Sequence, residues 1–205
     1  MSFKLGNTTI GELYVGSNKI AQAYLGSNLV FQSAAPTPLV DEVTIGTQTW
    51  KNQDLTGTDG GTGISVVDGK YYYTTDAAQR MASYISGWHV PTQTEYETLL
   101  SYIGTNACQK LKTTSGWLDK EPGDGGGTGN GTDEYGFHGA PVGYNSNGTV
   151  YGNGEFVFYL TTTTGGFLMN RYVYTLLLDR DEDGARVSQI GNDGYTYGAV
   201  RLIKD

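Results

Sequence analysis

The sequence predicts an α+β fold, in which two helices in the middle of the chain are followed by a mainly antiparallel sheet. Two segments between residues 76 and 104 have capping-box spacing, the second also carries apolar residues at helical spacing, and the residues after 113 read as strands and loops. The 31 glycines among 205 residues indicate many tight turns. Because helices and strands occur in blocks and do not alternate, we expect no parallel βαβ sheet.

Composition narrows the classes of partner. The net charge of −8 repels nucleic-acid phosphates, so no nucleic-acid partner is expected. No stretch approaches the roughly 18 apolar residues of a membrane span, and we expect no membrane insertion. The first residues lack the apolar core of a signal peptide. The chain as given is therefore expected to be made in the cytoplasm. It would leave by lysis, by assembly into a particle, or after losing a leader not contained in it.

The first thirty residues repeat with a period of ten. Residues 5–10, 15–20 and 25–30 each place a turn of Gly, Asn and Ser or Thr between two apolar residues. Such turns favour tight hairpins, so three or four short strands in a meander are predicted. A piece of this size cannot bury a core alone. We therefore interpret residues 1–32 as an adaptor or oligomerisation segment that packs against copies of itself or a larger assembly.

A linker and one larger domain follow the repeats. Residues 33–42 contain Pro36 and Pro38 and are predicted to be an extended linker. Residues 43–205 are predicted to form a single domain. Its first element, residues 43–50, alternates like a strand pair with a turn at Gly46.

Two helices are predicted next. The first spans 76–83, where Asp76 and Gln79 have the spacing of a capping box. The second begins after Thr92, whose spacing from Glu95 also matches a capping box, and ends at Gly104. A short turn of helix is expected at 106–111. The apolar face of the second helix consists of Tyr96, Leu99, Leu100 and Ile103.

Strands are predicted at 150–163, 171–178, 186–190 and 197–203. The glycine-rich stretch 123–131 lacks the lysine and the following helix of a phosphate-binding loop, so it is predicted to be a flexible surface loop. Trp88 and Trp117 lie beside turns, and we interpret both as core residues.

Five motifs in a fixed order resemble a known family. They are Ile-Gly-Thr-Gln-Thr-Trp at 45–50, Gly-Trp-His-Val-Pro-Thr at 87–92, the segment 110–117, the segments 131–137 and 141–144, and the ending 197–203. Together, over about residues 43–205, they resemble the Fibrobacter succinogenes major paralogous domain. The resemblance implies a C-type-lectin-like fold, shared with formylglycine-generating enzymes and with the variable proteins of diversity-generating retroelements. The decapeptide repeat resembles segments of gut-phage tail proteins.

An enzymatic role is not expected. The formylglycine-generating relatives work through cysteines that bind copper or form a redox pair, and this chain has only Cys108. We interpret Cys108 as a small buried hydrophobe. The histidines are His89 and His138, and His89 is predicted to make a structural hydrogen bond. No histidine or cysteine spacing typical of a zinc site occurs, so no cofactor is predicted.

Calcium is the alternative that the sequence leaves open. Asp179, Asp181 and Asp183 precede Gly184 in the pattern of the first half of a calcium loop. Ile190 stands where that loop needs a bidentate glutamate, so a charged hairpin turn is favoured over a metal site. The Glu-Pro-Asn and Trp-Asn-Asp triplets of the sugar-binding C-type lectins are also missing, because Gly123 follows Glu-Pro.

The favoured site is a surface near the end of the chain. Its residues are tyrosines and small polar side chains, the composition of antibody paratopes. Alternation along a strand places Tyr172 and Tyr174 on one face and Val173 on the other. In retroelement-diversified relatives this final region carries the variable positions. The predicted ligand-binding residues are Phe167, Met169, Arg171, Tyr172, Tyr174, Ser188, Gln189, Asn192, Asp193, Tyr195 and Tyr197.

These observations predict a non-enzymatic binding protein. We expect a host-recognition protein of a phage tail, located in the virion and open to diversification by a retroelement. Its ligand would be a host-cell surface protein or glycan, and a homotrimer formed through the N-terminal repeats would add avidity. The alternatives are a bacterial surface or secreted adhesin with the same domain, a formylglycine-generating-type enzyme, and a structural tail component without a ligand.

Overall fold

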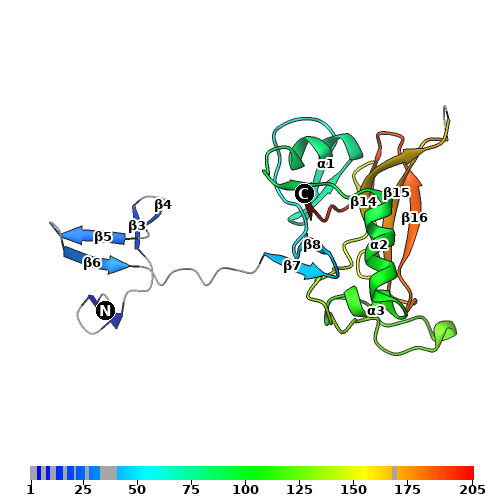
Figure 1. The fold of residues 1–205 in the computed structure, drawn as a ribbon, viewed down its shortest axis with the longest axis horizontal. Helices are drawn as coiled ribbons and strands as arrows, with labels where there is room; N and C mark the ends of the chain where they lie inside the picture. The colour runs from blue at the N-terminus through cyan, green and yellow to red at the C-terminus, as the bar shows by residue number, and fades with distance from the viewer. Residues whose placement is uncertain are drawn as a thin grey trace. The chain divides into compact units, whose positions relative to one another are not determined.

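The computed structural model divides the chain into two compact units, residues 1–41 and 42–205 (Figure 1). It describes residues 4–5, 8–9, 13–15, 18–20, 22–25, 28–32, 41–167 and 170–205. Residues 33–40, most of the predicted linker, lie outside the described residues. The boundary between the units falls one residue before position 43, where the sequence places the start of the larger domain.

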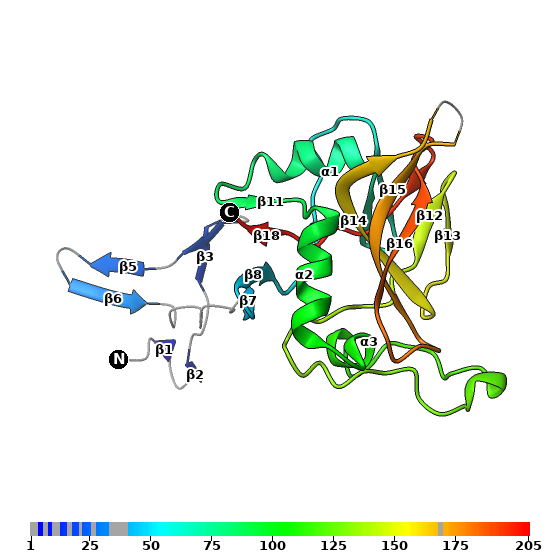
Figure 2. The same cartoon turned by 45° about the vertical axis from the view of Figure 1, so that its right-hand side comes forward.

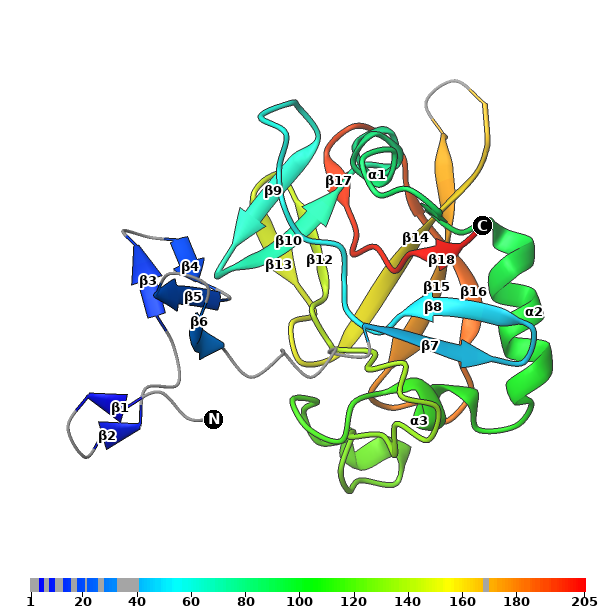
Figure 3. The ribbon, with the colours of Figure 1, turned by 60° about the vertical axis from the view of Figure 1, so that its left-hand side comes forward.

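The described strands of the N-terminal unit form three antiparallel hairpins and not one meander (Figure 3). Each of the described strands pairs only with its neighbour in sequence. The described strands of this unit are therefore more than the three or four expected, and the predicted turns between paired strands lie outside the described residues. The hairpins are β1 (Lys4–Leu5) with β2 (Thr8–Thr9), β3 (Leu13–Val15) with β4 (Asn18–Ile20), and β5 (Gln22–Leu25) with β6 (Asn28–Gln32).

The main sheet of the second unit is antiparallel, in the order β14 (Phe156–Gly165), β15 (Tyr172–Asp179) and β16 (Arg186–Gly191). Helix α2 (Gln93–Ile103) packs against all three strands (Figure 2). The predicted stretch 150–163 is wrong as a single strand. It contains β13 (Thr149–Tyr151) and the start of β14, because a turn with Gly152 and Gly154 at positive φ separates them.

Smaller sheets complete the unit. One has the strand order β11 (Trp88–His89), β18 (Ile203–Lys204), β8 (Gln48–Lys51) and β7 (Glu42–Ile45). A second has the order β13, β12 (Tyr144–Ser146) and β17 (Thr196–Tyr197). In the third, β9 (Ile64–Val67) pairs with β10 (Lys70–Tyr73). The strand pair predicted at 43–50 is confirmed as β7 and β8. The chain is thus a mixed α/β protein with few helices and mainly antiparallel sheets, as predicted for the fold class.

The predicted strand at 197–203 is wrong as a continuous element. Only its ends are strands, in β17 and β18. Between them the backbone bonds successively to Tyr73, Leu55 and Lys51, so its partners change along the segment. A segment that changes partners in this way cannot be one ladder of a single sheet.

The helices show which capping signals act locally. The box at Thr92 and Glu95 is confirmed, with Thr92 N donating to Glu95 Oε2 at 2.7 Å, and Gly104 ends α2 at φ +71°. The capping box predicted at Asp76 is wrong. The N-cap of α1 (Thr75–Ala82) is Thr74, whose Oγ1 accepts from Ala77 N. Because β10 leads directly into α1, Thr74 is still extended and serves as the N-cap before Asp76 is reached. Helix α3 (Ala107–Leu111) forms as expected.

Aromatic rings surround a buried cation in the core. Trp50 stacks on Tyr96 with centroids 5.2 Å apart. Arg201 is 1% exposed and lies against the rings of Phe137 and Tyr159. Its guanidinium donates to Asp54 Oδ1 at 2.5 Å and also to backbone carbonyls. The arginine of the C-terminal motif is therefore a core residue.

The two predicted core tryptophans differ in burial. Trp117 is buried, whereas Trp88 is half-buried and lies under Lys51 Nζ, 4.3 Å from the ring centroid. In the part of the chain that the structure describes, no helix combines the length and apolar character required to cross a bilayer.

Candidate functional site

A pocket of about 620 Å³ gathers Arg171, Asn192, Asp193 and Tyr195 from the predicted ligand surface. Arg171 directly precedes β15, and the others belong to the turn that joins β16 to β17. The opposite wall is formed by Thr74 and Asp76, at the start of α1, and Gly194 completes the lining. The pocket therefore lies where two loops of the sheet region meet the N-terminus of a helix.

The turn after β16 is held by its own side chain. Asp193 Oδ1 accepts hydrogen bonds from Tyr195 N and Thr196 N, both at 2.9 Å, and Gly194 has φ +83°. The bond from Tyr195 N, with that from Thr196 N, holds the pKa of Asp193 below its usual range. Asn192 N donates to Arg171 O at 3.0 Å, which fixes the two loops to each other. The pocket is thus preorganised by backbone contacts.

Its functional groups point to solvent. Among the residues that the structure describes, the Arg171 guanidinium has neither a hydrogen-bond nor an ion-pair partner, although Asp76 and Asp193 line the same pocket. The ring of Tyr195 is 62% exposed. An unpaired guanidinium beside an exposed ring is available for contact with a second molecule.

Tyr172 and Tyr174 form a second feature next to the pocket. Their rings meet edge to face with centroids 5.4 Å apart, and both are half-buried, whereas Val173 is buried. The predicted alternation along this strand is confirmed. A hydrogen bond with Tyr174 raises the pKa of Tyr172. A Cβ at Gly165, on the neighbouring strand, would lie 2.6 Å from the Tyr172 ring, so a larger residue there would force this ring to shift.

The other predicted residues are more scattered. Gln189 pairs with Tyr174, but Ser188 pairs with Thr175 and faces the opposite side of the sheet. Tyr197 is half-buried against the core, and Phe167 is largely exposed in the loop before β15. Met169 lies outside the described residues. Strand β16 therefore presents Ser188 and Gln189 on opposite faces of the sheet, as alternation along a strand requires.

Sequence reasoning missed Thr74 and Asp76. Both lie far from the C-terminal segment in sequence, and their proximity to Tyr195 depends on how α1 packs. No local pattern near residue 74 could have indicated it.

The aspartates considered for calcium each have a different partner. Asp179 Oδ1 accepts from Asp181 N at 3.0 Å, and Asp181 Oδ1 accepts from Glu121 N at 2.8 Å. Asp183 Oδ1 accepts from Lys120 Nζ at 2.9 Å, and this bond lowers the pKa of Asp183. Within residues 41–167 and 170–205, no three His, Cys, Asp or Glu side chains are grouped to hold a metal ion.

The residues considered for catalysis have structural contacts. Burial raises the pKa of the Cys108 thiol to about 11, and Cys108 Sγ donates to Asp179 O. His89 Nδ1 lies 2.7 Å from Asp205 Oδ1 and its Nε2 lies 3.0 Å from Glu95 Oε1. Burial lowers the pKa of His89, but these two hydrogen bonds outweigh it and the pKa is raised overall. The predicted structural role of His89 agrees with this geometry.

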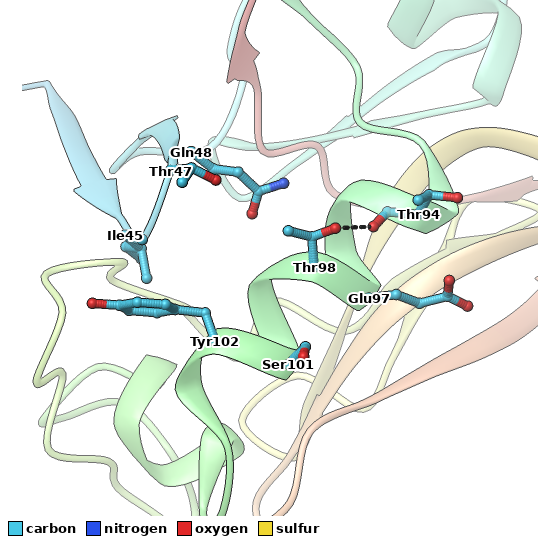
Figure 4. A pocket seen from close by; sticks show the side chains of 9 residues that line it. Ile45, Thr47, Gln48, Thr94, Glu97, Thr98, Ser101 and Tyr102 are labelled. Atoms are coloured by element: carbon cyan, nitrogen blue, oxygen red, sulfur yellow. Dashed lines mark hydrogen bonds between the residues drawn. The ribbon is translucent and has the colours of Figure 1, made fainter.

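A second, larger groove of about 720 Å³ lies between the β7–β8 hairpin and α2 (Figure 4). Its side chains bond mainly within the protein. Thr98 Oγ1 donates to Thr94 O at 2.8 Å, and Gln93 Nε2 donates to Glu97 Oε1 at 2.7 Å. Gln48 Nε2 donates to Glu95 O at 2.9 Å. Glu97, the charged residue of this lining, already accepts a hydrogen bond from Gln93, whereas Arg171 has no partner among the described residues, so we regard the smaller pocket as the candidate site.

In comparisons with known proteins, the chain matches no protein-family model, no curated protein and no solved structure. The groups that line the pocket at Arg171 and Tyr195 are therefore the basis on which its function is inferred.

Proposed function

We propose that this chain is a non-enzymatic receptor-binding protein whose second unit has a C-type-lectin-like fold. It binds a molecule on the surface of a host cell in the pocket lined by Arg171, Asn192, Asp193 and Tyr195. The observation that carries the proposal is a pocket, preorganised by backbone hydrogen bonds, that is lined by the exposed Tyr195 and by Arg171, whose guanidinium has no partner among the described residues. Rigid rings with adaptable polar neighbours are the usual means of protein recognition at such surfaces.

Binding is favoured over catalysis by the state of the reactive groups. Cys108 is buried and its raised pKa disfavours the thiolate that a nucleophile or metal ligand requires. Both ring nitrogens of His89 are engaged by carboxylates. Neither residue lines the pocket at Arg171.

The C-type-lectin-like assignment is supported by the order of the five sequence motifs and by what their residues do. Thr92 caps α2, Trp117 is buried, and Arg201 lies at the centre of the core. Three of the five motifs thus supply a structural contact of the second unit.

The proposed setting is a phage tail, with the N-terminal hairpins forming a trimer that adds avidity to a modest single site. A tail-gene neighbourhood would support this setting, whereas a leader or lipoprotein cysteine encoded upstream would favour a bacterial adhesin. A neighbouring reverse transcriptase gene, with a template repeat matching the codons of residues 145–203, would support diversification.

The test is binding of the fluorescently labelled full chain to a panel of intact gut bacteria. We expect saturable binding to at least one strain, lost in Arg171→Ala and Tyr195→Ala. Tyr84→Ala is the matched control, because Tyr84 is 68% exposed and does not line the pocket. Equal loss in the control, unchanged binding in the two pocket variants, or no saturable binding to any strain would contradict the proposal.

A further inference from the structure

The charges of the pocket restrict the ligand. Arg171 contributes one positive charge, and Asp76 and Asp193 contribute two negative charges. A simple anion would be attracted to Arg171 but would also approach both carboxylates. A simple cation would meet the guanidinium and the positive end of the α1 dipole. Neither kind of ion matches the whole lining.

A ligand that both donates and accepts hydrogen bonds does match it. The ionised carboxylate of Asp193 keeps acceptor capacity beyond its two backbone bonds, since it offers about four lone-pair positions. Arg171 only donates, and the Asn192 amide does both. A hydroxyl group can accept from Arg171 and donate to Asp193 at once, so a polyol satisfies donors and acceptors without carrying net charge.

The ring of Tyr195 supplies an apolar face, which a polyol site needs in addition to hydrogen-bonding groups. It is 62% exposed at the edge of these polar groups, and its face can pack against the C–H face of a pyranose ring. The volume of about 620 Å³ is in the usual range for small-ligand sites. We infer that the pocket binds a neutral saccharide unit of a cell-surface polysaccharide. This inference deepens the proposed function and rests on it.

The direct test is a printed array of neutral, uronic-acid-bearing and free-amine-bearing oligosaccharides, probed with the full chain. We expect binding to neutral members, competed by a free neutral sugar of the bound type. Arg171→Gln should weaken this binding by about tenfold or more, since a charge-assisted bond is lost. Tyr195→Phe should retain it and Tyr195→Ala should lose it, because the ring and not the hydroxyl makes the contact.

Glu97→Gln, in the groove of Figure 4, is the matched control and should bind normally. Preference for uronic-acid or amine-bearing members, equal loss in the control, or Tyr195→Ala binding as well as wild type would overturn the inference.

Treating intact cells with periodate or with protease distinguishes the saccharide inference from the proposed receptor-binding function. Periodate cleaves the vicinal diols of glycans, whereas protease removes surface proteins. Binding lost after periodate and kept after protease supports the saccharide. Arg171-dependent binding that survives periodate but not protease would overturn the saccharide and leave receptor binding intact. No binding to cells or array would overturn both.

Discussion

The buried guanidinium of Arg201 should contribute more to stability than any other charged side chain described above. Arg201→Met keeps most of the aliphatic volume but removes the donors to Phe137 O, His138 O and Lys51 O. Leaving a buried acceptor unpaired costs about 1–3 kcal/mol. The bond to Phe137 O is buried and the other two are partly buried, so losing all three together costs about 3 kcal/mol. The Asp54 carboxylate is partly exposed and can rehydrate, so its lost pair adds only about 1 kcal/mol.

We therefore expect Arg201→Met to lower the free energy of unfolding by about 4 kcal/mol, a large share of the roughly 5–15 kcal/mol of a typical domain. Urea unfolding followed by tryptophan fluorescence measures it, because Trp50 is fully buried beside the cluster. Arg186→Met is the matched control. Arg186 is 49% exposed and pairs with Glu182 at the surface, so its loss should change stability by no more than about 0.5 kcal/mol. If both variants lost the same amount, or Arg201→Met lost under about 1 kcal/mol, the reasoning would be refuted.

Three other outcomes are expected. The pKa of His89 is raised in the folded state, so its contribution to stability is fully present below about pH 6.5 and lost as pH rises through the folded pKa; urea unfolding across this range should show that loss, and His89→Gln should remove it. Glu95→Ala should lower the unfolding free energy by about 0.5–2 kcal/mol by breaking the capping box at Thr92, and a helix that melts unchanged would contradict this. Cys108 should react with a thiol reagent at pH 8 only after denaturation, and rapid labelling of the native chain would show that the thiol is accessible.

Local signals in the sequence predicted local structure. The box at Thr92 and Glu95, the stop at Gly104 and the alternation around Val173 all depend on residues a few positions apart. The start of α1 was misplaced because Thr74 and Asp76 are both good N-caps, and only the end of β10 determines which of them is used.

Contacts between distant segments could not be predicted in the same way. The pocket needs Asp76 beside Tyr195, and an isolated arginine such as Arg201 gives no sign in the sequence that it is buried. The mixed orientation of Ser188 and Gln189 follows from strand register, which the composition of the segment does not reveal.

In the loop after β16, the residues that set its shape differ from those that would contact a ligand in the proposed function. Asp193 and Gly194 close the turn, while Asn192 and Tyr195 line the pocket without a side-chain role in closing it. Substitutions at 192 and 195 would therefore change the ligand specificity of the proposed site without changing the backbone conformation of the loop. Such variants would have similar free energies of unfolding and would bind different ligands.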